Sequence, residues 1–195
     1  TFRIPSVSEL GANGVHHGTF RHEVGNANLN PERAHQFDAG FNITLPKLTI
    51  NGNAFFNYFN AVIYLAASGQ FSPLPDAGQV YIYTQDQAIH TGFELYTAYT
   101  PFAQIVLEST TEYVYTQTIA NQSALPFMPP FMQQLKATCK GPKKYQWHVG
   151  ITAVLAAAQN LTDRNEPATP GYAIWHFNAG YTFNLAKTQL VLNLI

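Results

Sequence analysis

The stretch that decides the fold is "GYAIWHFNAGYTFNL", Gly171–Leu185, in which apolar and polar side chains alternate. The apolar positions are Ala173, Trp175, Phe177, Ala179, Tyr181, Phe183 and Leu185. The residues between them, from His176 to Asn184, are small or polar. Strict alternation predicts a β-strand with two unlike faces, because successive side chains of a strand point to opposite sides. One face must therefore meet an apolar medium and the other a polar one.

The same alternation recurs along the chain, and no stretch shows a convincing helical period. It predicts an all-β fold, an antiparallel up-and-down meander of about eight strands plus a stub. The predicted strands cover residues 34–46, 48–66, 79–99, 103–118, 133–140, 144–160, 172–185 and 188–195.

The predicted connections alternate in length. Short turns fall near Pro46, near Pro101, at 140–144 and at 185–187, whereas long loops cover 5–33, 67–78, 119–132 and 161–171. Short turns at one end and long loops at the other are typical of an outer-membrane β-barrel. Several predicted strands also exceed the roughly 9–11 residues that a tilted strand needs to cross a bilayer.

Composition excludes several classes of protein. Only 11% of the 195 residues are charged, compared with about 25% in an ordinary soluble domain. The net charge of −1 gives no electrostatic basis for binding nucleic acid. The single Cys139 excludes an internal disulfide framework. The sequence shows no phosphate-binding loop, nucleophile elbow or zinc-protease motif.

Alternation alone leaves two kinds of β protein open. In a soluble sandwich or a lipocalin-like barrel the apolar face points inward, whereas in a membrane barrel it faces lipid. The long strands, their uncharged polar faces and the aromatic residues near the strand ends favour lipid. Those aromatic residues are Tyr96, Tyr99, Phe102, Tyr145, Trp147, Tyr181 and Phe183. Because a bilayer offers backbone groups no hydrogen bonds, such strands cross it only within a closed barrel.

Three segments carry recognisable motifs. They are "IPSVSELGANGVHHGTFRHEVGNANLNPERAHQFDAGF" (residues 4–41), "ALPFMPPF" (124–131) and "ATPGYAIWHFNAGYTF" (168–183). Their order and spacing resemble the TonB-dependent outer-membrane receptors. The first motif rests on Pro5, Ser6, Glu9, Leu10, Gly14, His16, Gly18, Thr19, Glu23–Asn26, Leu29, Pro31 and Glu32.

The resemblance implies a fragment of a larger barrel. Members of that family enclose an N-terminal plug domain within a barrel of about 22 strands. Residues 1–195 would then form one partial barrel domain, with the plug domain and the closing C-terminal strand absent. The expected partners are outer-membrane lipid, the protein's own plug and, through that plug, the TonB complex.

The function that the resemblance implies is active import across the bacterial outer membrane. Because import makes and breaks no bond, the resemblance also implies a protein that is not an enzyme. The receptor would bind a scarce nutrient, most readily a metal chelate such as a siderophore or a metal, and import it with energy supplied through TonB. No resident cofactor is expected, since the metal would be cargo. The alternatives are a passive porin-like barrel, which would lack a plug-encoding region upstream, and a soluble β-sandwich binding module.

Two groups of residues are candidates for the site. His16, His17, His22 and Glu23 lie in the loop expected outside the cell, and their side chains are of types that bind zinc, copper or iron. Their spacing matches no standard metal site, so the metal is unknown, and the alternative is that they brace the loop. The second group is expected to face the lumen and meet the plug. It comprises His90, Glu94, Gln146, His148, His176 and Asn178.

Overall fold

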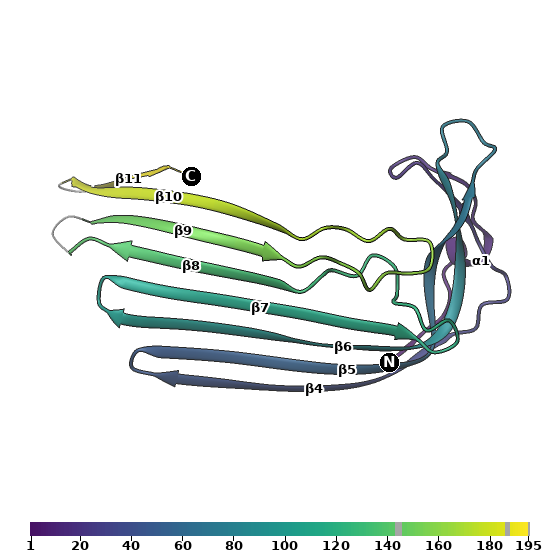
Figure 1. Ribbon diagram of the computed structural model, residues 1–195, viewed down its shortest axis with the longest axis horizontal. Helices are drawn as coiled ribbons and strands as arrows, with labels where there is room; N and C mark the ends of the chain where they lie inside the picture. The colour runs from purple at the N-terminus through teal and green to yellow at the C-terminus, as the bar shows by residue number, and fades with distance from the viewer. Residues whose placement is uncertain (143–145, 186–187, 195) are drawn as a thin grey trace.

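The computed structural model describes residues 1–142, 146–185 and 188–194 of the chain. It contains eleven strands in one sheet and a single short helix (Figure 1). The elements are β1 (Phe2–Arg3), α1 (Val7–Gly11), β2 (Asn13–His16), β3 (Arg21–Val24), β4 (Glu32–Leu45), β5 (Leu48–Phe71), β6 (Gln79–Phe102), β7 (Ile105–Thr118), β8 (Met132–Lys140), β9 (Trp147–Ala156), β10 (Tyr172–Leu185) and β11 (Thr188–Leu194). No helix among these described residues is long and apolar enough to cross a membrane.

Strands β4 to β11 form the predicted antiparallel meander, each paired with its neighbour in sequence. The predicted strand at 144–160 is wrong at its end, because β9 stops at Ala156 and only an isolated bridge, Gln159 with Thr169, follows. Residues 144, 145, 186, 187 and 195 lie outside the described residues.

The hydrogen-bond register aligns the alternating residues into two continuous faces. Directly paired residues of an antiparallel sheet share a face. One row therefore crosses the sheet from β4 to β10 through Leu45, Leu48, Tyr99, Leu107, Ala137, Ile151 and Phe177. A row on the other face runs through Thr44, Thr49, Ala98, Glu108, Lys136, Thr152 and His176. We call these the apolar face and the polar face.

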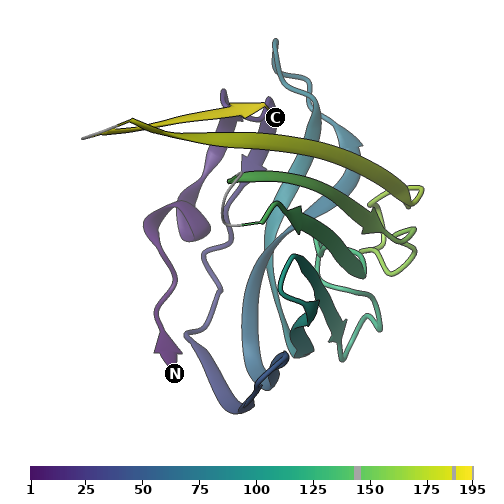
Figure 2. The same cartoon turned by 90° about the vertical axis from the view of Figure 1, so that its left-hand side faces the viewer.

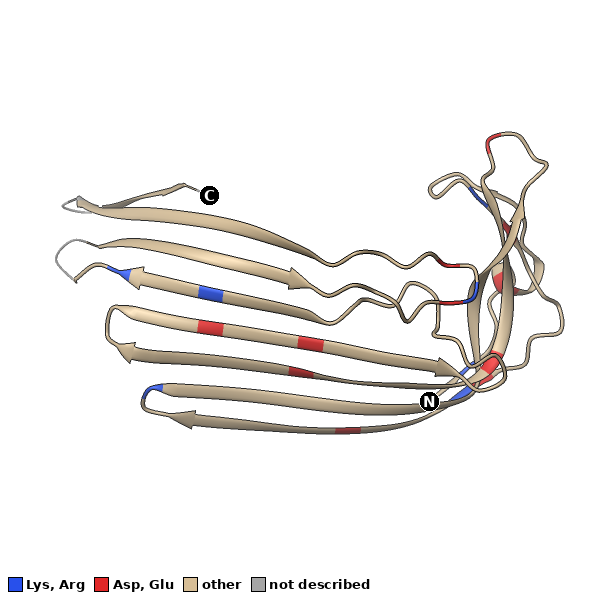
Figure 3. Ribbon diagram, in the orientation of Figure 1, with Lys and Arg blue, Asp and Glu red and all other residues tan. Residues whose placement is uncertain are grey.

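The charged residues follow the same division. In the described strands from residue 36 of β4 to β11, outside residues 62–84, the charged side chains are Asp38, Asp86, Glu94, Glu108, Glu112, Lys136 and Lys140 (Figure 3). All of them except Asp86, which pairs with Val62 beside a β-bulge, belong to the polar face by register. A sheet that carries large exposed apolar residues on one face and its charges on the other has the surface of a membrane barrel wall.

The sheet is curved and open rather than closed (Figure 2). Strands β1 and β11 lie at its two ends and do not pair with each other. The turns at 46–47 and 103–104 lie at one end of the strands, the short-turn end, and the loops at 119–131 and 157–171 lie at the other, the long-loop end (Figure 1). The architecture is that of a barrel fragment.

The long-loop end is more ordered than the sequence suggested. The segment 5–33, expected as a loop, contains α1 and the hairpin of β2 and β3, and β3 pairs with β6 in parallel, which departs from the purely antiparallel prediction. The expected loop at 67–78 is shorter, because β5 continues to Phe71. Residues 62–84, the β5–β6 extension, follow a β-bulge between Phe59 and Val62 and rise away from the sheet (Figure 1).

A small core forms where this extension leaves the sheet. Val62, Ala88 and Leu125 are buried together, with Phe59, Tyr64 and Met128 packed against them. The Leu125 backbone N–H donates to Thr116 Oγ1 at 2.9 Å, which ties the 119–131 loop to the end of β7. The core thus fixes the base of the β5–β6 extension to a neighbouring loop.

Candidate functional site

The polar face carries a mixed set of charges near its centre. Lys136 Nζ on β8 lies 2.9 Å from Glu108 Oε2 on β7, and the Tyr96 hydroxyl donates to Glu108 Oε1 at 3.0 Å. Glu94 on β6 is directly paired with Glu112 on β7, so two carboxylates stand side by side. Like charges directly opposite each other destabilise a sheet. Glu108 is therefore compensated within the sheet, whereas the described residues give Glu94 and Glu112 no ion pair.

Five of the six predicted lumen residues lie on the polar face. His90 and Glu94 occupy β6, His148 occupies β9, and His176 and Asn178 occupy β10; their registers run to Asn57, Asn53, Lys140, Thr152 and Gly150 respectively. Gln146 precedes β9, is exposed and has a positive φ of 42°, while its carbonyl accepts from the Thr182 N–H at 3.0 Å. The five are spread over β6, β9 and β10 instead of gathering at one point.

Glycines give two of these side chains room to lie along the sheet. A Cβ at Gly150 would approach Asn178 Oδ1 to 2.2 Å, and one at Gly180 would approach His148 Cε1 to 2.3 Å. Any larger residue there would displace the amide or the imidazole. At these two positions the sequence places glycine where a bulky polar group of the next strand leans over the backbone.

His90 sits in a partly apolar part of the polar face. Its ring contacts Phe55 edge to face, with the centroids 5.1 Å apart. The neighbouring Asn57 Oδ1, and Asn51 Oδ1 further along β5, are buried acceptors with no hydrogen-bond donor among the described residues. Such acceptors require water or another protein surface.

The structure does not bring the four residues of the first predicted group into one ligand set. The His16 Nδ1 contacts Thr19 Oγ1 at 3.1 Å, and His17 is exposed in the turn between β2 and β3. His22 contacts Ser72 Oγ at 2.8 Å, whereas Glu23 accepts from the Tyr83 hydroxyl at 3.2 Å. His22 and Glu23 are adjacent on a strand, so they point to opposite faces.

No metal-binding cluster is present in the part of the chain that the structure describes. Groups of three or more His, Cys, Asp or Glu side chains close enough to hold one ion do not occur there. The described contacts of His16, His22 and Glu23 instead join the β2–β3 hairpin to itself and to the β5–β6 extension.

An ionic clamp, formed by Arg3, Glu9 and Glu32, holds the N-terminal segment against the sheet. Arg3 Nη1 lies 2.8 Å from Glu9 Oε2, and Arg3 Nε pairs with Glu32 Oε2. The Ile63 N–H, just past the bulge in β5, donates to Glu32 Oε1. Although burial acts to raise the pKa of Glu9, the hydrogen bonds from Arg3 and Ser6 outweigh it and lower that pKa. The two carboxylates raise the pKa of Arg3, with Glu32 contributing most.

Sequence reasoning missed a second tie, the aromatic contact of Arg21. Its guanidinium carbon lies 4.6 Å from the ring centroids of both Tyr81 on β6 and Phe127 in the 119–131 loop. The two rings are themselves 6.2 Å apart. This cation–π contact joins three segments that are distant in sequence.

The two long loops meet the β5–β6 extension around two small cavities, each of about 230 Å³. The Asn165 Nδ2 donates to the Ala67 carbonyl at 2.8 Å, and Glu166 accepts from the Phe127 N–H at 3.1 Å. Ser123 Oγ donates to Asp163 Oδ1 at 3.1 Å. The long-loop end therefore presents polar and aromatic surfaces around these two cavities.

Comparisons with solved structures give the same architecture. The copper transporter OprC matches with a TM-score of 0.77 at 18% identity over 93% of this chain. The siderophore receptor PirA from Acinetobacter baumannii matches with a TM-score of 0.62 at 14% identity over 94%, and the ferric yersiniabactin uptake receptor FyuA from Yersinia pestis with 0.57 at 9% identity over 85%. The chain spans 27%, 32% and 28% of these three structures.

Sequence comparison defines the family. Comparison with curated protein sequences gave no match. The family described as "TonB dependent receptor-like, beta-barrel" matches residues 1–194. The structural neighbours above are named as a transporter and as receptors. The chain belongs to the TonB-dependent receptor family and forms part of its β-barrel.

Proposed function

We propose that this chain is the wall segment of a receptor that imports a metal or a metal chelate across the bacterial outer membrane with energy supplied through TonB, and that it is not an enzyme. The observation that carries the proposal is the two-faced sheet of a family member: large apolar side chains stand exposed on one face, and the charges of the strands lie on the other. The apolar face then lies against lipid and the polar face toward the lumen.

The direction of the segment follows from its connections. In outer-membrane barrels the short turns face the periplasm and the long loops face outward. The short-turn end of this sheet would therefore be periplasmic, and the cavities beside the β5–β6 extension would face the cell exterior.

The polar face supports a plug as the partner inside the barrel. The carboxylates of Glu94 and Glu112 stand exposed side by side, and the amide oxygens of Asn51 and Asn57 are buried without a donor among the described residues. A plug surface that carries Arg or Lys would pair with these acceptors, because charge-assisted hydrogen bonds are among the strongest available.

The cargo is proposed from the neighbours, whose names state copper, a siderophore and ferric yersiniabactin. We propose no resident cofactor, since a metal would pass through as cargo. The sequences of these neighbours are too distant to choose between a free metal and a chelate, so the experiment must present both.

The decisive experiment expresses the complete reading frame in a bacterium with its TonB system intact or deleted. We expect heat-modifiable protein in the outer membrane and uptake of radiolabelled iron or copper, free or chelated, that disappears when TonB is deleted. Uptake of small solutes that persists without TonB would instead identify the passive porin-like barrel. A water-soluble product would refute the barrel.

A further inference from the structure

A groove crosses the apolar face of the sheet. Three hollows adjoin one another there, and neighbouring hollows share residues: the first and second share Ala137 and Ile151, and the second and third share Val149. The first two measure about 360 and 390 Å³, within the range of roughly 300–1,000 Å³ that small ligands occupy.

The sequence explains why the face is hollow at this place. Small side chains, Ser109, Ala137 and Ala153, form the floor, while Leu107, Leu135 and Trp175 stand beside them as walls. By register all six belong to the apolar face. The groove is therefore separate from the polar face and from the cavities at the long-loop end.

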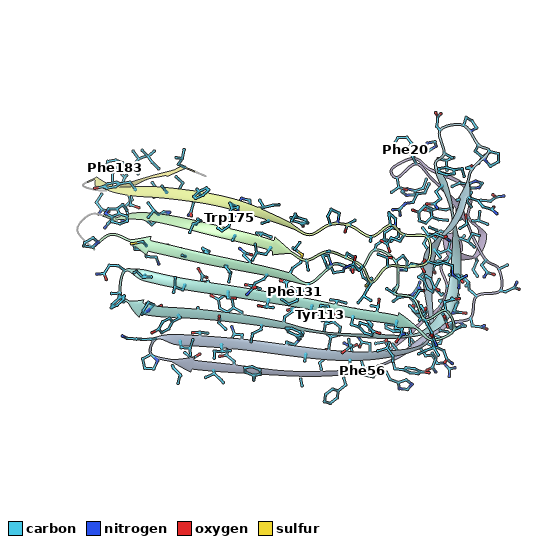
Figure 4. All side chains as sticks on the ribbon, viewed as in Figure 1. Phe20, Phe56, Tyr113, Phe131, Trp175 and Phe183 are labelled. Carbon is cyan, nitrogen blue, oxygen red and sulfur yellow. The ribbon has the colours of Figure 1, made fainter. Side chains whose placement is uncertain are left out.

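The groove has a direction. Its first hollow reaches Trp175 near the start of β10, toward the long-loop end, and its third lies between Trp147, Tyr181 and Leu192 at the short-turn end. Figure 4 shows Trp175 along the strand and Phe183 at the short-turn end. Aromatic rings at strand ends mark the level of the lipid headgroups in barrels. The groove thus runs from a membrane interface toward the interior of the bilayer.

We propose that this groove holds one acyl chain of a phospholipid from the periplasmic leaflet. The inference rests on the proposed function, which places the apolar face in the bilayer and the short-turn end in the periplasm. The groove is continuous with that lipid-facing surface, and the two charged residues that border it, Glu108 and Lys136, belong by register to the opposite, polar face, so hydrocarbon fits it along its length.

Lipid tails are as apolar as the groove, so the hydrophobic effect gives an acyl chain no preference for the groove over the surrounding bilayer. The attraction therefore comes from packing contacts. A chain in the groove touches floor and walls, whereas one on the flat surface touches a single side. About ten additional carbon–carbon contacts sum to roughly a tenfold preference for the groove.

The test uses the full-length protein in vesicles of phosphatidylethanolamine and phosphatidylglycerol that contain a phospholipid with a diazirine in one acyl chain. After irradiation, adducts are mapped by mass spectrometry. We expect about tenfold more adducts per exposed residue on β8 and β9 than on the apolar face of β4 and β5. A diazirine near the headgroup should label Val149, and one near the chain end should label Ala153 or Trp175.

Filling the groove provides the matched control. Ala137→Leu should abolish the tenfold excess, whereas Ala39→Leu on the apolar face of β4, outside the groove, should leave it unchanged. Heat-modifiable migration confirms that both variants fold.

Four results would overturn the proposal. Even labelling of the whole apolar face would refute the groove while leaving the membrane orientation intact. If the diazirine near the headgroup labelled Ala153 or Trp175 and the one near the chain end labelled Val149, the acyl chain would enter from the outer leaflet. Weak labelling of the groove, together with oxidative crosslinking between the Cys139 residues of two copies, would assign it to a second copy of the protein. Absence of adducts from the apolar face altogether would refute the proposed orientation itself.

Discussion

Two adjacent residues of β10, Phe177 and Asn178, test the orientation of the sheet. Phe177 is 65% exposed on the apolar face, in the row that ends at Leu45, while Asn178 lies over Gly150 on the polar face. We expect Phe177→Lys to lower the free energy of unfolding by about 2–4 kcal/mol, because a charge near the bilayer midplane loses its hydration. Denaturant titration of the full-length receptor in lipid vesicles measures the loss.

Asn178→Lys is the matched control, because it adds the same charge one residue away. On a hydrated face this charge should lower the free energy of unfolding by well under half as much as Phe177→Lys does, apart from any displacement of the neighbouring side chains. Equal losses for the two variants would contradict the assignment of faces.

Arg21 is the residue whose loss should loosen the long-loop end. Because its guanidinium contacts Tyr81 and Phe127, Arg21→Met removes a cation–π contact worth about 0.5–1 kcal/mol when partly exposed. Hydrogen exchange at the Leu125 amide should become about two- to fivefold faster, since the 119–131 loop opens more often. Arg33→Met, an exposed arginine at the same end, should leave that rate unchanged.

The candidate residues show where sequence reasoning reached its limit. The sequence was sufficient to predict that the polar-face residues share one face of the sheet, because the alternation of their strands extends over ten or more residues. The histidines near the N-terminus looked like a cluster because they are close in sequence. His22 and Glu23 are neighbours in the short strand β3, so their side chains point to opposite faces. A strand of only four residues is too short to show a reliable period. Arg21 gave no local signal, since both of its aromatic partners are distant in sequence.

At the scale of elements, the clamp between α1 and β4 should weaken in acid. The pKa of Glu9 is lowered below its ordinary value of 4.5, so its charged form stabilises the folded clamp. Such a group contributes stability that is complete above its unfolded pKa and is lost as the pH falls through its folded pKa. We expect α1 to detach below about pH 4.5, where that loss begins.

A spin label at Val7→Cys, in a protein whose other cysteines are removed, reports the detachment as a narrowing of its spectrum. Val7 is 89% exposed, so the label leaves the packing of α1 unchanged. Arg3→Met should free α1 at neutral pH and abolish the acid step. An acid step of unchanged size in that variant would show that another group controls it.

The elements themselves divide into those that the sequence predicts and those that tertiary contacts create. The strands of the meander are long and strictly alternating, so their positions could be read directly. Helix α1 is too short to show a period, although Ser6 and Glu9 form the capping box that marks its start. The parallel pairing of β3 with β6 depends on residues almost sixty positions apart, which no local pattern encodes.

At the scale of the whole molecule, the membrane-type sheet and the long-loop end are stabilised differently. The core of the described residues is small and lies beside the β5–β6 extension, whereas the sheet exposes its large apolar side chains. The sheet therefore depends on lipid and on whatever fills the lumen, and the long-loop end depends on its own contacts. Stability of the barrel should respond to changes in the plug even where no loop changes.

The carboxylates of Glu94 and Glu112 make that dependence measurable. If the plug supplies a cation between them, Glu94→Gln should lower the free energy of unfolding of the full-length receptor by about 1.5–3 kcal/mol, the usual contribution of a hydrogen bond to a charged group. In a plug-deleted barrel the same change relieves repulsion between paired carboxylates and should raise that free energy by about 0.2–1 kcal/mol. Glu108→Gln is the control, because its partner Lys136 lies in β8 and the change should destabilise both proteins. A stabilising effect of Glu94→Gln in both proteins would show that the plug places no cation there.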